Sequence, residues 1–411
     1  MKKIVVVGSG FGGLSIASKL KAKKFDVTLI EKHKDLGGRA RTFVHNDFKY
    51  DAGPTVITAP YLIDELFSVH SEKLSDYVNL LPVKPWYRFL FDSGDYIDYG
   101  DKLISTVHEI KAKYGNDKAK AYLKLLKHSK QIFKKGFIEL SDEPFESIYS
   151  MLKHLPALIK IRFDRSVYQT VNKYLNNKNL NEALSMHPLL VGGNPYSTTS
   201  IYLLIQYLEW KWGVYYAEGG TGRIIDGLEK LLIKKDVNIK KNTEAKKIIL
   251  KNNKVVGIDT SQGIIDCDIV VCNSDPTYTY NNLLGFKPKK ASNRFNLKHS
   301  MSLFVLYFST TKIYKDVKHH TIIFSKRHYE LLNDIFNKKV FVSDPSLYLH
   351  RPGATDPSMI QNGNDTFYVL APVPNNLSKI DWNDKGNKLA NIIIKNLQEK
   401  IMPELTKNIS D

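Results

Sequence analysis

The sequence predicts an α/β protein with a parallel sheet near its N-terminus, a helical middle region and a second, mixed sheet toward its C-terminus. Three patterns support this expectation. Lys2–Val7 is a β-branched run that ends in a glycine turn. Residues 101–185 have helical apolar spacing and few turn residues, whereas residues 291–374 contain a series of short β-type runs. A chain of 411 residues is too long for one small core, so we expect two or three domains.

The N-terminal segment combines a strand, a glycine loop, a helix and a second strand in immediate succession. Its glycines fit G-x-G-x-x-G: the first permits a tight turn, the second lets the backbone approach a pyrophosphate, and the third lets the helix pack on the strand. The helix N-terminus would face the phosphates. The second strand, Asp26–Ile30, is followed by an acid that can accept hydrogen bonds from a ribose. This order favours a Rossmann-like dinucleotide site over an ordinary glycine-rich loop. Its candidate residues are Gly8, Ser9, Gly10, Phe11, Gly12, Gly13, Glu31 and Lys32.

A second glycine turn, Leu36–Thr42, follows the nucleotide-binding pattern. The adjacent Gly37 and Gly38 let backbone amides reach a phosphate, and Arg39 supplies a fixed fork of donors. By itself this pattern also suits a surface turn with a solvated arginine pair. Directly after the dinucleotide pattern, it resembles the second signature of the FAD-dependent amine oxidase and desaturase superfamily. The string DAGPTVIT, at 51–58, resembles the bacterial and fungal phytoene desaturases, which are flavoenzymes of carotenoid biosynthesis.

This resemblance extends along the whole chain, through the strings LLVGGNP, WGVYY, EGGTG, SLFVLYF and YVLAPVP. It implies bound FAD, with its ribose at Glu31, its flavin near Arg39 and Pro54, Thr55 and Val56, and its adenine near Ala245. It also implies that phytoene enters an apolar channel from a membrane and passes hydrides to the flavin, giving a conjugated carotenoid such as lycopene. Related activities remain open: a C30 desaturase, a carotenoid isomerase or a ketolase. No catalytic residue is identified, because His187, Glu209 and Asp51 are as readily structural.

The resemblance divides the chain into four segments. Residues 1–80 and 219–290 would form the two parts of an FAD-binding domain. Residues 81–218 would form a helical, membrane-associating region of the substrate domain, and residues 291–411 its sheet and final helix. The family's C-terminal glycine-rich motif, which closes the flavin site, does not occur before Asp411. We therefore expect a fragment or a truncated open reading frame rather than a self-sufficient enzyme. An inactive remnant that no longer holds flavin remains an alternative.

Several shorter predictions concern individual elements. Residues 60–70 are expected to form a helix with Leu62, Leu66 and Phe67 on one face, and Ile148–Phe163 is either an amphipathic membrane-surface segment or a core helix. Further strands and helices are expected at Arg88–Phe91, Tyr96–Tyr99, Ile224–Lys234, Ile239–Ile248, Val255–Asp259, Asp268–Asn273, Ser302–Phe308, Thr321–Phe324, Ser346–His350 and Phe367–Pro372. The last four should pair as an antiparallel sheet, and a turn at Asn252–Asn253 should join Ile239–Ile248 to Val255–Asp259.

Composition limits the partners. The net charge of +18 suits anionic membrane surfaces, although lysine-rich composition alone explains much of it, and the lysine clusters are not interleaved with aromatics as in nucleic-acid-binding motifs. No apolar run reaches about 18 residues, and the first residues already form a strand, so we expect no signal peptide and a cytoplasmic, peripherally membrane-associated protein. Cys267 and Cys272 fit a reducing compartment. Adjacent His319 and His320 should lie on opposite faces of a strand, so we expect no metal site.

Overall fold

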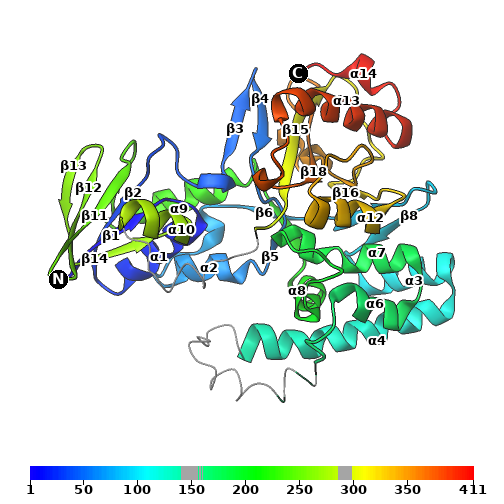
Figure 1. The fold of residues 1–411 in the computed structure, drawn as a ribbon, viewed down its shortest axis with the longest axis horizontal. Coiled ribbons are helices and arrows are strands. Elements are labelled where there is room, and N and C mark those ends of the chain that lie inside the picture. The colour runs from blue at the N-terminus through cyan, green and yellow to red at the C-terminus, as the bar shows by residue number, and fades with distance from the viewer. Residues whose placement is uncertain (140–155, 157–158, 160, 286–298) are drawn as a thin grey trace. The chain divides into compact units, whose positions relative to one another are not determined.

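The computed structural model describes residues 1–139, 156, 159, 161–285 and 299–411 (Figure 1). The chain folds into two units, each assembled from two separate stretches. Unit 1 consists of Met1–Leu81 with Tyr215–Lys298, and unit 2 of Pro82–Val214 with His299–Asp411.

Unit 1 is built on a four-stranded parallel sheet with the order β10-β2-β1-β14. Val6 of β1 packs against helices on one face, together with Leu14 and Leu228, whereas Val5 and Val7 pack on the other face. This alternation follows from the two-residue period of a strand. The bounds are β1 (Lys3–Val7), β2 (Asp26–Ile30), β10 (Asn238–Lys240) and β14 (Ile269–Cys272), with helices α1 (Phe11–Ala22), α2 (Tyr61–Ser68), α9 (Gly222–Lys234) and α10 (Pro276–Tyr278).

A three-stranded antiparallel meander covers the second face of this sheet through Ile248 and Ile258. Its strands are β11 (Ala245–Lys251), β12 (Lys254–Thr260) and β13 (Gly263–Asp266). The predicted turn at Asn252–Asn253 is confirmed, since both residues have positive φ. The predicted strand Ile239–Ile248 is wrong as one element, because it divides into β10 and β11, which belong to different sheets. The chain turns at Asn242, where φ is +52°, and the next residue donates its N–H to the Glu31 carbonyl at 2.7 Å.

The predicted helix at 60–70 forms as α2, and of the three residues expected on one face only Leu62 departs from the buried face. Leu66 and Phe67 are buried, and Ile63 packs against the same core, whereas Leu62 is 43% exposed. Ile63 precedes Leu66 by three positions and Phe67 by four, so these three share one helical stripe and Leu62 lies beside it. Shorter strands nearby are β3 (Thr42–His45), paired with β4 (Phe48–Asp51), and a sheet β5-β9-β6 of Ile57–Thr58, Val214–Ala217 and Leu80–Pro82.

Unit 2 contains a six-stranded sheet with the order β15-β18-β17-β16-β7-β8. The expectation of an antiparallel sheet at 291–374 holds for β15 to β18, but β16 pairs parallel with β7, which makes the whole sheet mixed. A parallel pair is possible here because a long connection joins β7 to β16 along the chain. The bounds are β7 (Tyr87–Leu90), β8 (Tyr96–Tyr99), β15 (Ser302–Thr310), β16 (His320–Ile323), β17 (Leu347–His350) and β18 (Asp365–Val373).

One face of the six-stranded sheet is covered by the long helix α13 (Trp382–Lys400). Leu349, Phe367 and Val369 of the sheet share a buried cluster with Leu389 and Ile393 of the helix. The opposite face therefore carries the alternating residues, including many aromatic and histidine side chains.

The predicted helical character of 101–185 is confirmed in its described part. Much of the proposed amphipathic segment Ile148–Phe163 lies outside the described residues. Among the helices that the structure describes, none has both the length and the apolar content needed to cross a bilayer. The remaining helices are α3 (Leu103–Tyr114), α4 (Asn116–Phe133), α6 (Val167–Leu175), α7 (Lys178–Ser185), α8 (Leu204–Trp212), α12 (His328–Asn333) and α14 (Leu405–Asn408).

Candidate functional site

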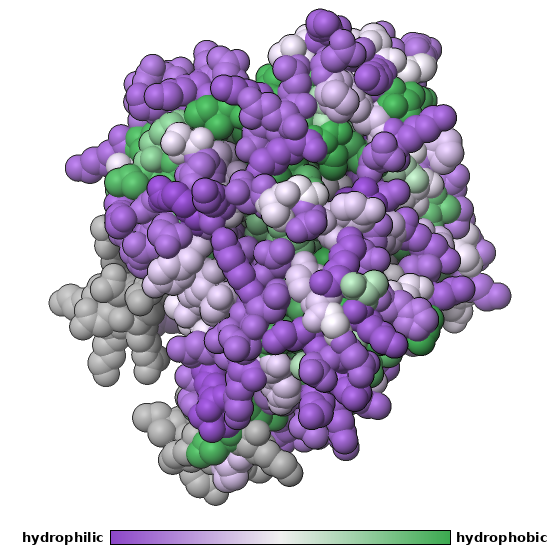
Figure 2. All heavy atoms as spheres, turned by 90° about the vertical axis from the view of Figure 1, so that its right-hand side faces the viewer, coloured by the Kyte–Doolittle hydropathy of each residue, from purple (hydrophilic) through white to green (hydrophobic). Residues whose placement is uncertain are grey.

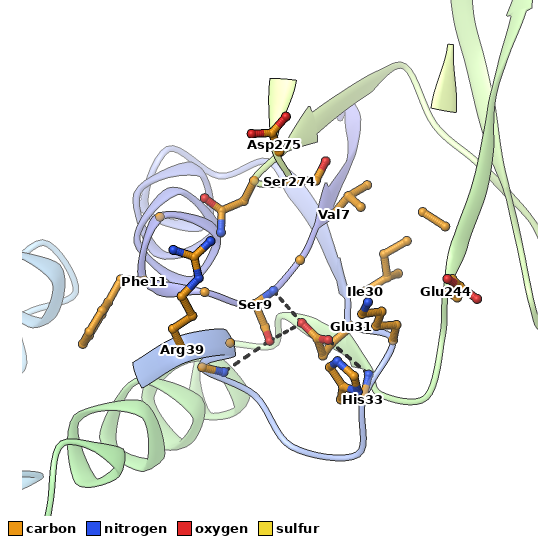
Figure 3. Close-up of a pocket in the computed structure, with 18 of the residues that line it drawn as sticks. Val7, Ser9, Phe11, Ile30, Glu31, His33, Arg39, Glu244, Ser274 and Asp275 are labelled. Carbon is orange, nitrogen blue, oxygen red and sulfur yellow. Dashed lines mark hydrogen bonds between the residues drawn. The ribbon is translucent and has the colours of Figure 1, made fainter. Parts of the chain in front are cut away.

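A cavity of about 710 Å³ lies in unit 1 at the carboxyl ends of β1, β2 and β14 (Figure 3). In open parallel sheets, ligands bind at this edge because loops from adjacent strands meet there. Three stretches line most of the cavity: the glycine loop after β1, the residues after β2, and the residues after β14. The side chains and backbone of its wall belong to Val7, Gly8, Ser9, Gly10, Phe11, Gly12, Ile30, Glu31, Lys32, His33, Gly37, Gly38, Arg39, Ala40, Pro54, Thr243, Glu244, Ala245, Asn273, Ser274, Asp275, Tyr278 and Leu283.

The glycine loop brings bare backbone to the cavity wall. Gly8 has φ of +88°, a conformation that side chains disfavour. A Cβ on Gly10 would lie 2.9 Å from Asn273 Nδ2, and one on Gly13 would overlap the carbonyl oxygen of Gly8. Gly10 is the N-cap of α1, so the first-turn N–H groups meet no capping side chain from that position. The loop is therefore suited to hold an anionic group at the positive end of a helix.

Glu31 organises the loop from the end of β2. Its carboxylate accepts hydrogen bonds from Ser9 N at 2.9 Å, Ser9 Oγ at 2.6 Å and His33 N at 3.1 Å. Burial raises the pKa of Glu31, but these hydrogen bonds outweigh burial, and the net result is a lowered pKa. An ionised carboxylate offers about four acceptor positions. One therefore remains for a ligand hydroxyl after the three protein bonds.

The second glycine turn packs directly on this loop. Gly37 N donates to the carbonyl oxygen of Ser9 at 2.9 Å, and a Cβ on Gly38 would lie 3.5 Å from Gly10 Cα. Arg39 is exposed and extends from this turn at the cavity wall (Figure 3). A Cβ on Gly53 would overlap the carbonyl oxygen of Arg39, so the DAGP segment also packs closely here. The two glycine turns and the Arg39 guanidinium therefore lie together in one wall of the cavity.

Comparison with known proteins shows which family the chain belongs to. Residues 11–336 match the model of flavin containing amine oxidoreductases. The chain is 40% identical over 414 residues to a lycopene-forming phytoene desaturase of Pseudescherichia vulneris and 39% identical to that of Pantoea ananas. Each alignment covers all of this chain and 84% of the relative. A solved putrescine oxidase double mutant has the same fold, with a TM-score of 0.64, 9% identity, and coverage of 100% of this chain and 84% of that one.

The chain belongs to the phytoene desaturase family. It is an FAD-dependent oxidoreductase of the flavin containing amine oxidoreductase group. The cavity of this phytoene desaturase relative fits FAD: Gly10 and Gly12 leave space that any Cβ would reduce, Arg39 offers a cation, and Glu31 offers an acceptor. These residues would hold a diphosphate and a ribose, which are the parts of FAD that need such groups.

Most of the residues predicted as cofactor contacts line the cavity, and their role as contacts stays a prediction. Gly13, Thr55 and Val56 are missing from the described cavity wall. Gly13 instead packs the start of α1 on Gly8, as the motif requires. Thr55 is buried and Val56 half-buried, because the chain turns inward after Pro54, whose carbonyl accepts a bond from Thr221 Oγ1 at 3.0 Å.

The sequence interpretation missed the residues after β14. Asn273, Ser274 and Asp275 complete the cavity edge beside the glycine loop. The available signal was the polar end of a buried strand, but its position next to β1 depends on the sheet order. Thr243 and Glu244 were missed for a similar reason, since β10 and β11 separate only in the folded chain.

Two other buried acids that the sequence singled out make contacts within their own units. Asp51 accepts bonds from Thr42 Oγ1, Thr221 N and Tyr216 OH, at 3.1, 2.8 and 2.7 Å, and so joins three segments of unit 1. In unit 2, Glu209 accepts a bond from Tyr87 OH at 2.9 Å and lies 3.1 Å from His187 Nε2. Both networks join separate segments of the chain within one unit, and no catalytic role follows from them.

Proposed function

We propose that this chain catalyses the FAD-dependent desaturation of phytoene to conjugated carotenoids such as lycopene. The observation that carries the proposal is the cavity at the carboxyl edge of the parallel sheet in unit 1, where the glycine loop, Glu31 and Arg39 meet. The full-length likeness to lycopene-forming relatives supports phytoene as the substrate.

Each part of the cavity wall has a proposed task. The backbone of Gly8–Gly13 and the start of α1 bind the diphosphate, and Glu31 accepts a ribose hydroxyl. Arg39 and Pro54 lie on the flavin side, while Ala245 contacts the adenine; Thr55 and Val56 support this wall from beneath. FAD bound here would accept the hydride that leaves one carbon of a saturated C–C bond, while the neighbouring carbon loses a proton and a C=C bond forms.

The proposed polyene surface is the face of the six-stranded sheet opposite α13. Strand alternation places Leu303, Val305 and Tyr307 of β15 on this face, beside Leu370 of β18 and Tyr348 of β17. Leu303 is 47% exposed. A hydrocarbon substrate offers no hydrogen-bonding groups, so its binding depends on apolar burial at about 25 cal/mol per Å². This surface supports the assignment of unit 2 as the substrate domain.

We also propose that the chain associates peripherally with anionic membranes from the cytoplasmic side. Its net charge of +18 favours such surfaces, at about 1 kcal/mol for each nearby basic group. Figure 2 shows a face dominated by hydrophilic side chains, with apolar ones in separate patches. Binding to vesicles with anionic lipid should weaken as salt rises, whereas salt-independent binding would contradict this part of the proposal.

The central experiment incubates the FAD-loaded chain with phytoene in vesicles and identifies the products by chromatography and visible absorption. Conjugated C40 products are expected. Parallel reactions with a C30 precursor, a cis-carotenoid and a preformed carotenoid test the desaturase, isomerase and ketolase alternatives. Turnover of one of these with intact phytoene would overturn the proposed substrate.

A matched pair of variants tests the proposed polyene surface. Val305→Asp places a charge on it and should lower turnover by at least about 10-fold while FAD remains bound. Val44→Asp places the same charge on an exposed position of β3 and should leave turnover unchanged. Equal activity of both variants would show that the polyene binds elsewhere.

A further inference from the structure

Three histidines gather on unit 2, outside the cavity of unit 1. The candidate ligand nitrogens of His319, His320 and His350 all lie within 4.8 Å of one another. The three side chains are 2%, 0% and 1% exposed. Their ring centroids are 4.4 Å apart for His319 and His320, 4.8 Å for His319 and His350, and 5.5 Å for His320 and His350.

The backbone explains how three imidazoles meet. His320 begins β16 and is the direct antiparallel partner of His350, which ends β17. Directly opposite residues project to the same face of a sheet. His319 lies in a bend just before β16, so strand alternation does not govern it. The expectation that His319 and His320 lie on opposite faces is therefore wrong.

Hydrogen bonds to neighbouring hydroxyl groups orient two of the rings through Nδ1. His320 Nδ1 lies 2.6 Å from Tyr348 OH, and His319 Nδ1 lies 2.8 Å from Thr355 Oγ1. Within the part of the chain that the structure describes, His320 Nε2 is buried and has no hydrogen-bond partner. Metal-binding histidines typically have this arrangement, in which an outer partner fixes one ring nitrogen and leaves the other as the ligand.

The positive charge next to the cluster is compensated. The nearby cation of Arg351 is paired, since its guanidinium binds the Asp365 carboxylate and the Val317 carbonyl.

We propose that His319, His320 and His350 bind one divalent transition-metal ion, such as Zn²⁺, and that a water molecule or small anion completes its coordination. Tetrahedral Zn²⁺ with Zn–N bonds of 2.0–2.1 Å needs nitrogens about 3.4 Å apart, so modest ring rotations would close the site. Three imidazoles favour zinc, copper, cobalt or nickel over magnesium and calcium.

A second cavity next to the cluster has room for the water molecule or small anion that completes the coordination. His319 lines a cavity of about 250 Å³ together with Lys84, Lys315 and Lys318. Lys84 is paired with Asp101 at 3.1 Å, whereas Lys315 and Lys318 would attract a small anion that balances the charge of a metal held by neutral ligands. The metal would clamp the end of β17 to the start of β16 and to the bend before it, which stabilises the middle of the six-stranded sheet.

The test titrates the purified, FAD-containing chain with Co²⁺ after treatment with a chelator, and records the difference spectrum and the metal content. We expect one equivalent to bind with the visible bands of a low-coordinate Co²⁺ site, Zn²⁺ to displace it, and the melting temperature to rise on loading. His320→Gln and His350→Gln should abolish these bands. Tyr348→Phe keeps all three ligands but loses the outer partner, so it should weaken binding by about 10- to 100-fold.

His328→Gln is the matched control. His328 is equally buried in unit 2, and its Nδ1 bonds to Ser346 Oγ at 3.0 Å, outside the cluster. This variant should keep the full Co²⁺ spectrum. The proposal is overturned by the lack of any saturable equivalent, or by bands that persist unchanged in His320→Gln. If the glutamine variants do not fold, unchanged affinity in folded Tyr348→Phe overturns it equally.

Discussion

Glu31 in unit 1 and Glu209 in unit 2 are both buried carboxylates, at 6% and 0% exposure, but they are held by different kinds of donor. Two of the three donors of Glu31 are backbone N–H groups within its own βαβ unit. The partners of Glu209 are side chains, Tyr87 from β7 and His187 from a distant turn. Glu31 lines a cavity, whereas Glu209 is enclosed between elements.

This difference shows that one residue type can serve two purposes. Backbone donors keep the shape of a ligand loop and leave one acceptor position of Glu31 available. Side-chain donors tie together elements that are far apart in sequence, and they use Glu209 as a bridge. We therefore expect changes at Glu31 to affect cofactor binding first and changes at Glu209 to affect stability first.

The largest stability loss is expected for Glu209→Ala. It leaves Tyr87 OH and His187 Nε2 buried without their acceptor, and breaking such a buried network typically costs about 3–5 kcal/mol. Urea denaturation would measure the loss. Glu218→Ala, at an exposed acid that bonds Asn79, is the control and should cost under about 1 kcal/mol. Similar urea midpoints for Glu209→Ala and Glu218→Ala would refute the bridging role of Glu209.

Gly13→Ala should have the next largest effect, and it should disrupt the glycine loop that Glu31 organises. Its Cβ would overlap the Gly8 carbonyl oxygen, so α1 must move from β1, at a cost of about 1–3 kcal/mol and with loss of retained FAD. Desalting after incubation with FAD, followed by absorption, measures retention. Gly386→Ala in α13, where a Cβ would meet only Phe304 at an ordinary 3.8 Å, should keep FAD. Full flavin retention by Gly13→Ala would contradict the close packing.

Glu31→Gln should weaken FAD binding by about 10- to 100-fold, because hydrogen bonds to a charged group contribute about 1.5–3 kcal/mol. Flavin fluorescence titration measures the affinity. Glu244→Gln removes an exposed acid from the same cavity wall and should change the affinity by less than about 3-fold. Equal effects at the two positions would mean that net charge, rather than the Glu31 contacts, governs binding.

The smallest expected effect is a pH dependence. Folding lowers the pKa of Glu31 from its ordinary value of 4.5, so folding favours the ionised form. The resulting stabilisation is complete above pH 4.5 and is lost as the pH falls through the lower folded value. Urea midpoints at pH 7 and about pH 4 should therefore differ more for the wild type than for Glu31→Gln. The same difference in both proteins would exclude Glu31 as the source.

The local parts of the site follow from sequence because they depend on short-range geometry. The strand at 2–7, the glycine spacing, the helix start and Glu31 all belong to one continuous segment, in which backbone dihedrals and periodicity decide the structure. The turn at Asn252–Asn253 was predictable for the same reason, since both residues tolerate positive φ.

Other features depend on which distant segments become neighbours, and only the tertiary structure decided them. Asn273 reaches the glycine loop because β14 pairs with β1, and the sheet of unit 2 is mixed because β7 pairs with β16. His320 meets His350 through the register of β16 and β17, while a bend brings His319 to them. Sequence by itself determined the periodicity of each element. The order and register of the strands decided the rest, because they result from the free energy of packing the whole chain.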